Sequence, residues 1–314
     1  MPDLSHLVAG TLGGLTSTVA LYPLELIKTR MQVAEVPVTS AATSTLQGRL
    51  RNPYGSVLGA LRQVLRNEGV RGLYKGMTPA MIASSGSWGG YFYFYERSKS
   101  RKLGQGGGSL TTVDHLSSGV EAGVILVFLF NPLWLIKTRM ALQGLDSVAL
   151  TGSSTAVPPA RKEYTGIFHA VRTIVREEGF VGLYKGVIPA LFLTSHGAVQ
   201  FAVYEWLKTK VNEQGFEGGG KQPAWASVLI GGASKIIAST VTYPYQVIKS
   251  RIQQREASFG EVRYSGMLDC IVKTWRHEGL FGFLRGVVPN ALKVAPSAAL
   301  TFVVYEETLK VMQP

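Results

Sequence analysis

The chain has 314 residues, of which 46% are hydrophobic and only 17% are charged, fewer than the roughly 25% usual in soluble domains. Its net charge of +12 suggests a nucleic acid or a membrane surface as the partner, and the position of the charges must decide between them. The one cysteine, Cys270, excludes an internal disulfide and a Cys/His zinc cluster, and we expect it to be a buried, inert thiol.

Six apolar segments follow one another along the chain, at about 4–30, 77–99, 113–141, 187–209, 225–253 and 287–310. Each is expected to form a helix that crosses a membrane; buried helices of a soluble protein are the alternative. Small residues recur four apart, as in Gly10 with Gly14 and Gly119 with Gly123. This spacing lets helix backbones approach closely, so we expect the helices to surround a polar interior.

Polar stretches separate the apolar segments. The stretches 164–178 and 264–278 carry apolar residues at helical spacing, which predicts short amphipathic helices on the membrane surface. Loops are expected at 34–50 and 144–160, and linkers at 104–108 and 217–220.

Three signatures recur in the same order, three times. The first begins at prolines spaced 109 and 112 residues apart: Pro23, Pro132 and Pro244. The second is a Glu-Gly pair followed by a Lys-Gly or Arg-Gly pair, beginning at Glu68, Glu178 and Glu278. The third is a Tyr-Glu pair that ends at Glu96, Glu205 and Glu306. The chain is therefore predicted to be three tandem repeats, 1–104, 105–220 and 221–314, that form one transport domain.

The basic residues lie mainly on one side of this arrangement. Stretches from each motif lysine to the following Lys-Gly or Arg-Gly hold 8, 7 and 7 of the 32 basic residues, whereas the opposite ends and linkers hold 4, 3 and 1. This asymmetry is typical of a protein that crosses a membrane several times, and it removes most support for nucleic-acid binding.

Lys235 and Lys293 are the two basic residues that remain, and both fall inside predicted spans. A lysine there costs several kcal/mol unless it faces water or a partner, so these two are candidates for binding an anionic solute. Snorkelling to an interface, or pairing with another helix, is the structural alternative. At 100° per residue, Lys235 lies within about 20° of Gln246 on one helix. Glu121 is expected to face a neighbouring helix.

Each motif proline should kink its helix, and the acid and lysine that follow it lie three residues apart on one face. With three such helices around an axis, acids of one helix could meet lysines of the next. These ion pairs would close one end of a central path and act as a gate, with ordinary helix-end salt bridges as the alternative.

On these motifs the chain resembles the mitochondrial carrier family over essentially its whole length. The resemblance implies an all-α barrel of six transmembrane helices with threefold pseudosymmetry, short surface helices on the matrix side and alternating access. It implies a matrix gate, in which Glu25 and Lys137 make the one complete ion pair while Trp134 and Gln246 replace acids. Lys249 and Lys28 are then left with cation–π or hydrogen-bonded partners. Gln32 and Gln253 match the glutamine brace of the family, and Ala141 does not.

The resemblance also implies a cytoplasmic gate, formed by Glu96, Lys99, Glu205, Lys208 and Glu306. Leu309 occupies the third basic position, so both gates are incomplete. Neither closed state is then locked strongly, and both exchange and one-way transport fit.

Pro132-Leu133-Trp134 is similar to the branch of the family that moves nucleotides, dinucleotides and related cofactors. Three further segments are most similar to the FAD and folate carriers of that branch: Ser87-Trp88-Gly89, 194–198 and Tyr243-Pro244-Tyr245-Gln246. The family's substrate contact positions fall on Ala83, on Leu193 or Phe192, and on Lys293. Lys235 would add a second charge, and His196 and Trp88 would also line the path. One cation opposite small and apolar positions suits a bulky aromatic ring that bears an anion. FAD or folate is thus the expected cargo, with no prosthetic group.

The resemblance further implies a multi-pass protein of the mitochondrial inner membrane, or else of the peroxisomal membrane. It should work as a monomer in the lipid bilayer, with cardiolipin as a possible matrix-side partner. NAD, pyrimidine nucleotides and adenine nucleotides are alternative cargoes. A non-transporting scaffold or a membrane enzyme is the alternative of another class, although no Ser/His/Asp set, metal cluster or phosphate loop supports an enzyme.

Overall fold

The structure is a computed structural model that describes residues 4–34, 56–106, 111–144, 163–213, 224–255 and 264–312. These residues form helices and contain no strand. The six long segments are α1 (Leu4–Val33), α4 (Met77–Gly106), α5 (Thr112–Leu142), α8 with η5 and α9 (Val187–Phe192, Leu193–Ser195, His196–Glu213), α10 with α11 (Ala224–Val241, Tyr243–Gln253), and α13 (Val287–Met312). All six expected helices are confirmed to within a few residues at most ends.

Two of the six long segments are interrupted. A 3-10 turn at Leu193–Ser195 separates α8 from α9, and Thr242 separates α10 from α11 just before Pro244. Lys235 lies on α10 and Gln246 on α11, so they are not on one continuous helix. The expectation that they share one helix face assumed such a helix.

Three stretches are long and apolar enough to cross a membrane by length and composition, namely Val113–Leu142, Phe180–Val211 and Val287–Met312. The other long helices miss this criterion, and the apolar part of α10, Leu229–Val241, is shorter. Gly, Ser, Thr and the charged motif residues lower the hydropathy of these helices, as expected where helices surround a polar path.

The surface helices are α3 (Val57–Gly72), α7 (Ile167–Glu178) and α12 (Met267–Gly282), with the 3-10 turn η4 (Phe180–Tyr184) after α7. In each repeat, the glycine of the Glu-Gly pair has a positive φ, as at Gly179 (φ 75°), where the helix changes direction. The expected loops 34–50 and 144–160 lie almost entirely outside the described residues, as do 107–108 and 217–220. The linker expected from Gly104 is wrong up to Gly106, because α4 continues to that residue.

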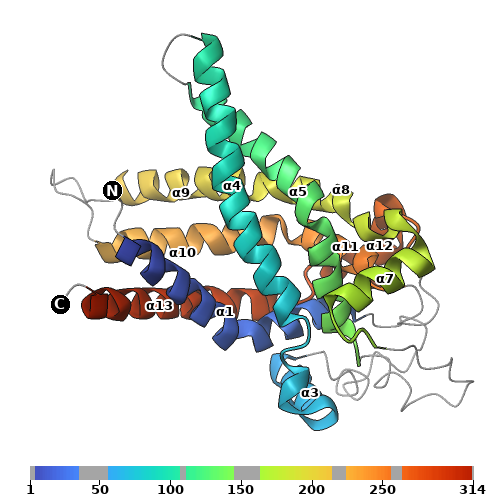
Figure 1. Ribbon diagram of the computed structural model, residues 1–314. Helices are drawn as coiled ribbons and strands as arrows, with labels where there is room; N and C mark the ends of the chain where they lie inside the picture. Colours follow the sequence, from blue (N-terminus) through green and yellow to red (C-terminus); the bar gives the residue numbers. More distant parts are fainter. Residues whose placement is uncertain are drawn as a thin grey trace, which may run out of the picture.

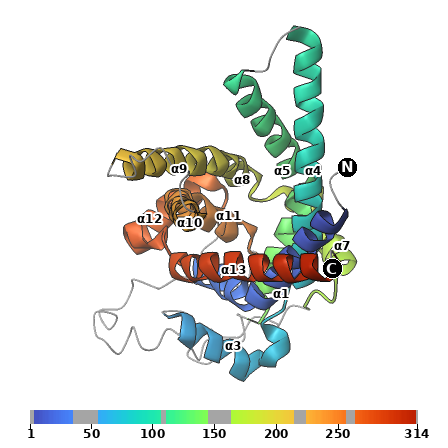
Figure 2. The same cartoon turned by 90° about the vertical axis from the view of Figure 1, so that its left-hand side faces the viewer.

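The long helices pack in three pairs: α1 with α13, α4 with α5, and α9 with α10 (Figures 1 and 2). Each pair joins two different repeats, and α1 with α13 joins the two ends of the chain. Gly13 makes close contact in this last pair, because a Cβ there would lie 2.7 Å from the carbonyl oxygen of Thr301.

The predicted roles of the glycine pairs are half right. Gly10 and Gly14 have nothing within 4 Å of a Cβ, so they make no close helix contact. Gly119 and Gly123 do face neighbouring segments, at 3.1 Å from the Tyr91 hydroxyl and 3.4 Å from Thr194.

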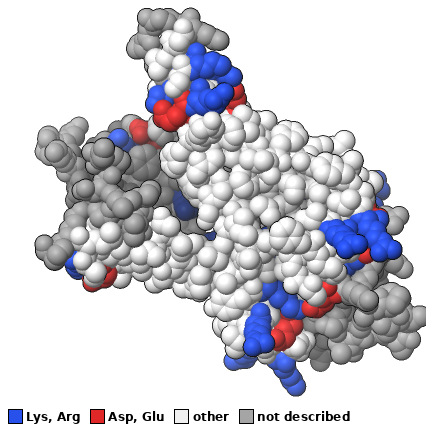
Figure 3. All heavy atoms as spheres, viewed as in Figure 1, with Lys and Arg blue, Asp and Glu red and all other residues white. Residues whose placement is uncertain are grey.

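The three pairs meet at one end, where α1, α5 and α11 contact one another, and separate towards the other. The α4 and α5 pair points away from the other two pairs (Figures 1 and 2). On the face shown in Figure 3, charged side chains gather at the far tip of α4 and α5 and near the surface helices. The surface between them is almost entirely uncharged, as expected for a region that contacts lipid.

Candidate functional site

The candidate site lies where the three proline-motif helices meet. In each of them, apolar residues just after the proline are buried, as at Leu26, Leu135 and Val247 (each 0% exposed). The polar residues of the same turns point the other way, because residues three or four apart share one face of a helix, as Glu25, Lys28 and Gln32 do. Burial of one face thus directs the charged face towards the centre of the molecule.

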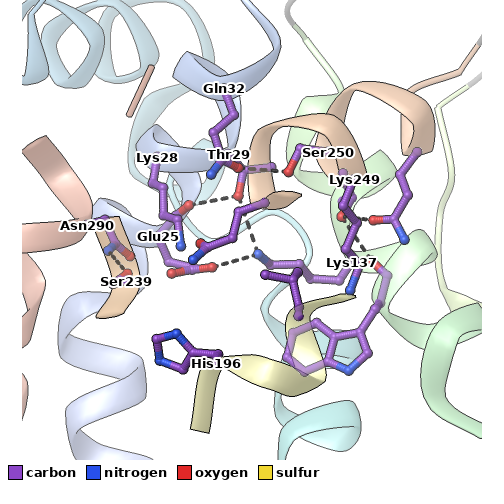
Figure 4. A pocket seen from close by; sticks show the side chains of 15 residues that line it. Glu25, Lys28, Thr29, Gln32, Lys137, His196, Ser239, Lys249, Ser250 and Asn290 are labelled. Atoms are coloured by element: carbon purple, nitrogen blue, oxygen red, sulfur yellow. Dashed lines mark hydrogen bonds and ion pairs between the residues drawn. The ribbon is translucent and has the colours of Figure 1, made fainter. Parts of the chain in front are cut away.

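A cavity of about 360 Å³ occupies this centre, and residues from all three repeats line it (Figure 4). Lys28, Lys137 and Lys249, one lysine from each proline motif, are all among them. The one acid that lines the described cavity is Glu25. The site is therefore rich in positive charge and suits an anion.

Glu25 makes two ion pairs. Its Oε1 lies 2.9 Å from Nζ of Lys137 on α5, and its Oε2 lies 2.7 Å from Nζ of Lys293 on α13. Lys137 also donates to the hydroxyl of Thr29 at 3.4 Å. The expected contact of Glu25 with Lys137 is confirmed, and Lys293 is an addition that the motifs did not reveal.

The other two motif lysines lie over aromatic rings. Nζ of Lys249 is 5.8 Å from the centroid of Trp134, the residue that replaces an acid, as the sequence suggested. Nζ of Lys28 is 5.9 Å from the ring centroid of Tyr243. An aromatic ring carries no negative charge, so these two contacts leave the cavity with an excess of positive charge.

The two brace glutamines join repeats through hydroxyl groups. Gln32 donates to the Tyr243 hydroxyl at 3.1 Å and accepts from Ser250 at 2.7 Å. Gln253 accepts from Thr138 at 3.0 Å. Both hold neighbouring motif helices together, but no described hydrogen bond links either to the Glu25–Lys137 pair.

A second set of ion pairs surrounds the lysines and Glu25. These pairs were not predicted from the sequence. The last residue of each proline motif is a buried arginine that binds the glutamate of a Glu-Gly pair: Arg30 with Glu68, Arg139 with Glu178, and Arg251 with Glu278. The signal was present in the sequence, because both partners recur in all three repeats.

Each of these arginines also reaches the next repeat through its Nε. Arg30 donates to the carbonyl oxygen of Ala141 at 2.9 Å, Arg139 to that of Gln253 at 3.0 Å, and Arg251 to that of Gln32 at 3.1 Å. The three contacts run in one direction round the axis and return to the first repeat. They tie each surface helix to the helix end that closes the cavity.

Burial alone would raise the pKa of Glu178, but hydrogen bonds and the charges of Arg139 and Lys185 outweigh it and hold the pKa below its ordinary value. The same balance lowers the pKa of Glu68 beside Arg30 and Lys75. Both carboxyls are therefore charged at neutral pH.

The residues of the second expected gate are not joined across repeats in this structure. Glu96 pairs with Lys99 at 3.0 Å, and Glu205 with Lys208 at 3.9 Å, each within its own helix. No ion pair that involves Glu306 and another repeat occurs among the described residues. The helix pairs are thus joined at the proline-motif end and apart at the other end.

The expected cargo contacts are spread over a wider region. Leu193 and His196 line the cavity, and the Nδ1 atom of His196 lies 3.0 Å from the hydroxyl of Thr242. Ala83 is fully buried, so its side chain is not available to a solute here. Phe192 directly precedes Leu193 in the chain, and its ring lies 5.2 Å from that of Tyr245 and nearly parallel to it.

Trp88, Phe192, Lys235 and Lys293 are not among the cavity-lining residues, although Lys293 binds Glu25, which is. Lys235 is exposed on α10 and lies near enough to Lys293 to interact with it electrostatically. Glu121 faces α4 as expected, where it accepts from Ser98 at 2.6 Å and from Arg101 at 2.7 Å. The described residues hold no group of three or more His, Cys, Asp or Glu that could bind a metal ion.

The threefold arrangement agrees with comparison to known proteins. The family model described as "Mitochondrial carrier protein" matches the chain three times, at residues 1–105, 108–215 and 220–314. The chain belongs to the mitochondrial carrier family. Members are built from three repeats, so this carrier has one unit for each proline motif.

Several curated relatives match the carrier over nearly its whole length. It is 40% identical to "Folate transporter 1, chloroplastic" of Arabidopsis thaliana, over 97% of this chain and 94% of that protein. It is 37% identical to "Mitochondrial substrate carrier family protein M" of Dictyostelium discoideum, over 98% and 96%. It is 35% identical to "Nicotinamide adenine dinucleotide transporter 1, chloroplastic" of Arabidopsis thaliana, over 96% and 90%.

Proposed function

We propose that this carrier moves an anionic cofactor with an aromatic ring system, FAD or folate, by alternating access across the mitochondrial inner membrane. The observation that carries the proposal is the cavity, in which three motif lysines face one carboxylate. A cargo with two negative charges would balance this excess. FAD supplies them in its pyrophosphate, and folate in its two carboxylates.

Aromatic side chains at and near the motif helices support a cargo with a flat ring. Phe192 and Tyr245 form a parallel stack, and the Trp134 ring lines the cavity itself. Such faces bind heterocycles by offset stacking. The position of Trp134 next to Lys249 matches a molecule with an aromatic part and a charged part.

In this proposal, the two ends of the path open in turn. Glu25, Lys137, Lys28, Lys249 and the residues that join them would be the matrix gate, which is closed here. The Tyr-Glu ends of the repeats would be the cytoplasmic gate, which is open here. Cargo would enter from the open end, reach the cavity and leave after the contacts between α1, α5 and α11 separate.

The relatives support folate as a cargo, and they leave NAD as a second candidate. The folate transporter shares 40% identity with this chain, and the NAD transporter 35%. NAD also has an aromatic system and a pyrophosphate. Its nicotinamide ring carries a positive charge, however, so its net charge balances the cavity less well.

Uptake into liposomes tests this proposal. The purified carrier, reconstituted in lipid vesicles, is given radiolabelled FAD, folate, NAD or ATP, and we expect saturable uptake of FAD or folate. Uptake of NAD alone would assign the carrier to NAD, and uptake of none of the four would overturn cofactor transport.

The matched control is a lysine outside the cavity. Lys310 pairs with Glu307 at 2.7 Å in the last turns of α13. Lys310→Gln should transport as well as the unaltered carrier, whereas Lys249→Gln should reduce uptake because it removes a cation that lines the cavity.

The mitochondrial inner membrane is proposed on the family and on relatives such as the Dictyostelium protein. Fluorescence imaging of a tagged full-length chain, together with fractionation, would place it in mitochondria, chloroplasts or peroxisomes.

A further inference from the structure

The two lysines that bind Glu25 are held very differently. Lys137 is almost buried, with a side chain 7% exposed, and Thr29 provides it with a second partner. Lys293 has a side chain 33% exposed, and Glu25 is its one ion-pair partner among the described residues. Lys293 is therefore the more accessible of the two cations.

The two contacts also differ in what they join. Lys137 lies on α5, so its bond to Glu25 links two different helix pairs. Lys293 lies on α13, which already packs along α1, so its bond to Glu25 lies within one helix pair. Loss of the Lys293 contact would leave the link between the pairs in place.

No other repeat offers an equivalent cation. The positions that correspond to Lys293 are Ala83 in the first repeat and Leu193 or Phe192 in the second. An anion that enters from the open end therefore meets Lys293 as a charged group whose position is already taken by a carboxylate.

We propose that Glu25 is a tethered competitor for the anionic group of the cargo, and that Lys293 is the cation for which the two compete. This inference rests on the proposed function in one respect, that the cargo is an anion. When cargo binds, Lys293 moves from the Glu25 carboxylate to the cargo anion, while Lys137 stays on Glu25. When the cargo leaves, Glu25 takes Lys293 back.

Competition of this kind solves a problem that the cavity creates. Several lysines around an anion in a partly desolvated space would bind it strongly, and a carrier that binds too strongly releases too slowly. Lys293 does not line the cavity itself, but it binds Glu25, which does. A carboxylate fixed 2.7 Å from this lysine acts at a high effective concentration and weakens its binding to the cargo.

The test measures anion affinity in the purified full-length carrier in detergent, with sodium pyrophosphate as the probe and FAD in a parallel series. Cys270 is the only cysteine and is fully buried, so a thiol-reactive dye reports unfolding as that side chain becomes accessible. The rise in melting temperature with probe concentration gives the dissociation constant.

We expect Glu25→Gln to bind pyrophosphate about tenfold more tightly, the size expected for one charge-assisted hydrogen bond. Lys293→Gln should bind about tenfold more weakly on the same basis. In the Lys293→Gln background, Glu25→Gln should change affinity by less than about twofold, because the contested cation is gone.

Equal gains from Glu25→Gln with and without Lys293 would show a general effect of net charge and would overturn the competition. A loss of affinity in Glu25→Gln would overturn it too. Glu307→Gln removes another lysine-bound carboxylate, outside the cavity, and should leave affinity unchanged.

Two further variants separate the possible failures. Glu25→Asp keeps the negative charge but shortens the reach to Lys293, so it should also bind the probe more tightly; it replaces Glu25→Gln if that variant does not fold. Pyrophosphate tests the competition for Lys293 whatever the cargo is. If the carrier takes up neither FAD nor folate, the proposed function is wrong, but the result of the pyrophosphate experiment still stands.

Discussion

The amino group of Lys249 lies 5.8 Å from the ring centroid of Trp134, on the neighbouring motif helix. At the equivalent position between the first two repeats, Lys137 instead faces the carboxylate of Glu25. A cation–π contact at such a site contributes about 0.5–2 kcal/mol, less than a well-formed ion pair with little water around it. The closed end of this carrier is therefore held less firmly between its second and third repeats than between its first and second.

Replacement of Trp134 by Glu should strengthen that contact. The new carboxylate would face Lys249, as Glu25 faces Lys137, and would reduce the excess positive charge in the cavity. We expect a melting temperature higher by about 2–4 °C and slower uptake into liposomes, because the closed state must be opened in every cycle.

Trp134→Gln is the control for the loss of the ring, since it has a similar length to Glu but no charge. It should lower the melting temperature slightly, and its rate of uptake gives the effect of losing the ring alone, against which any further slowing in Trp134→Glu is measured. If Trp134→Glu behaves like Trp134→Gln, Lys249 does not reach this position in the closed carrier.

Much of this fold could be predicted from the sequence because each feature is repeated three times. A proline followed by charges at fixed spacing, and a Glu-Gly pair after it, placed the long helices and the surface helices. The contact of Glu25 with Lys137 followed from the same periodicity, since each motif helix meets its neighbour in the same way.

Features that occur once could not be predicted in this way. Lys293 lies 268 positions from Glu25, and no repeated pattern connects them. The break at Thr242 also has no counterpart in α1 or α5, which continue through their prolines. Helical-wheel reasoning treated 225–253 as one helix and carried Lys235 across that break; of the two residues that it aligned, only Gln246 lines the cavity.

Stability at low pH should depend on Glu178. Burial favours the protonated form, but Arg139 and Lys185 lower the pKa below its ordinary value of 4.5. A lowered folded-state pKa stabilises the folded carrier above about pH 4.5, and this contribution disappears as the pH falls through the folded-state pKa. The melting temperature should therefore be steady from pH 7 to about 5.5 and fall below about 4.5.

Glu178→Gln should cost about 3 kcal/mol or more at pH 7, because it leaves the buried guanidinium of Arg139 without its carboxylate. The difference from the unaltered carrier should shrink in acid. The adjacent Glu177 makes a more exposed contact with Arg255, so Glu177→Gln should cost less than about 1 kcal/mol. Equal losses in the two variants, measured by thermal unfolding, would contradict the special role of the buried pair.

The stacked rings of Phe192 and Tyr245 predict a change in affinity for cargo without a change in stability. Phe192 is half exposed, so Phe192→Ala leaves no buried void. If a flat heterocycle stacks there, the KM for FAD or folate should rise by about three- to tenfold, since one aromatic contact contributes about 0.5–1.5 kcal/mol. Phe192→Tyr should preserve the KM, and an unchanged KM in Phe192→Ala would place the ring of the cargo elsewhere.

Lys99 should affect transport far more than stability. In this structure it pairs at 3.0 Å with Glu96, one turn earlier on the same exposed helix surface, and such pairs contribute only about 0.3–0.5 kcal/mol. If the Tyr-Glu ends of the repeats close the path in the other half of the cycle, Lys99 must leave Glu96 and meet an acid of another repeat. Lys99→Ala should then melt within about 1 °C of the unaltered carrier and yet transport more slowly.

Arg101→Ala is the matched control, because Arg101 pairs with Glu121 on the neighbouring helix and is not one of the residues expected to close this end. Equal rates in all three proteins would mean that Lys99 takes no part in closing this end.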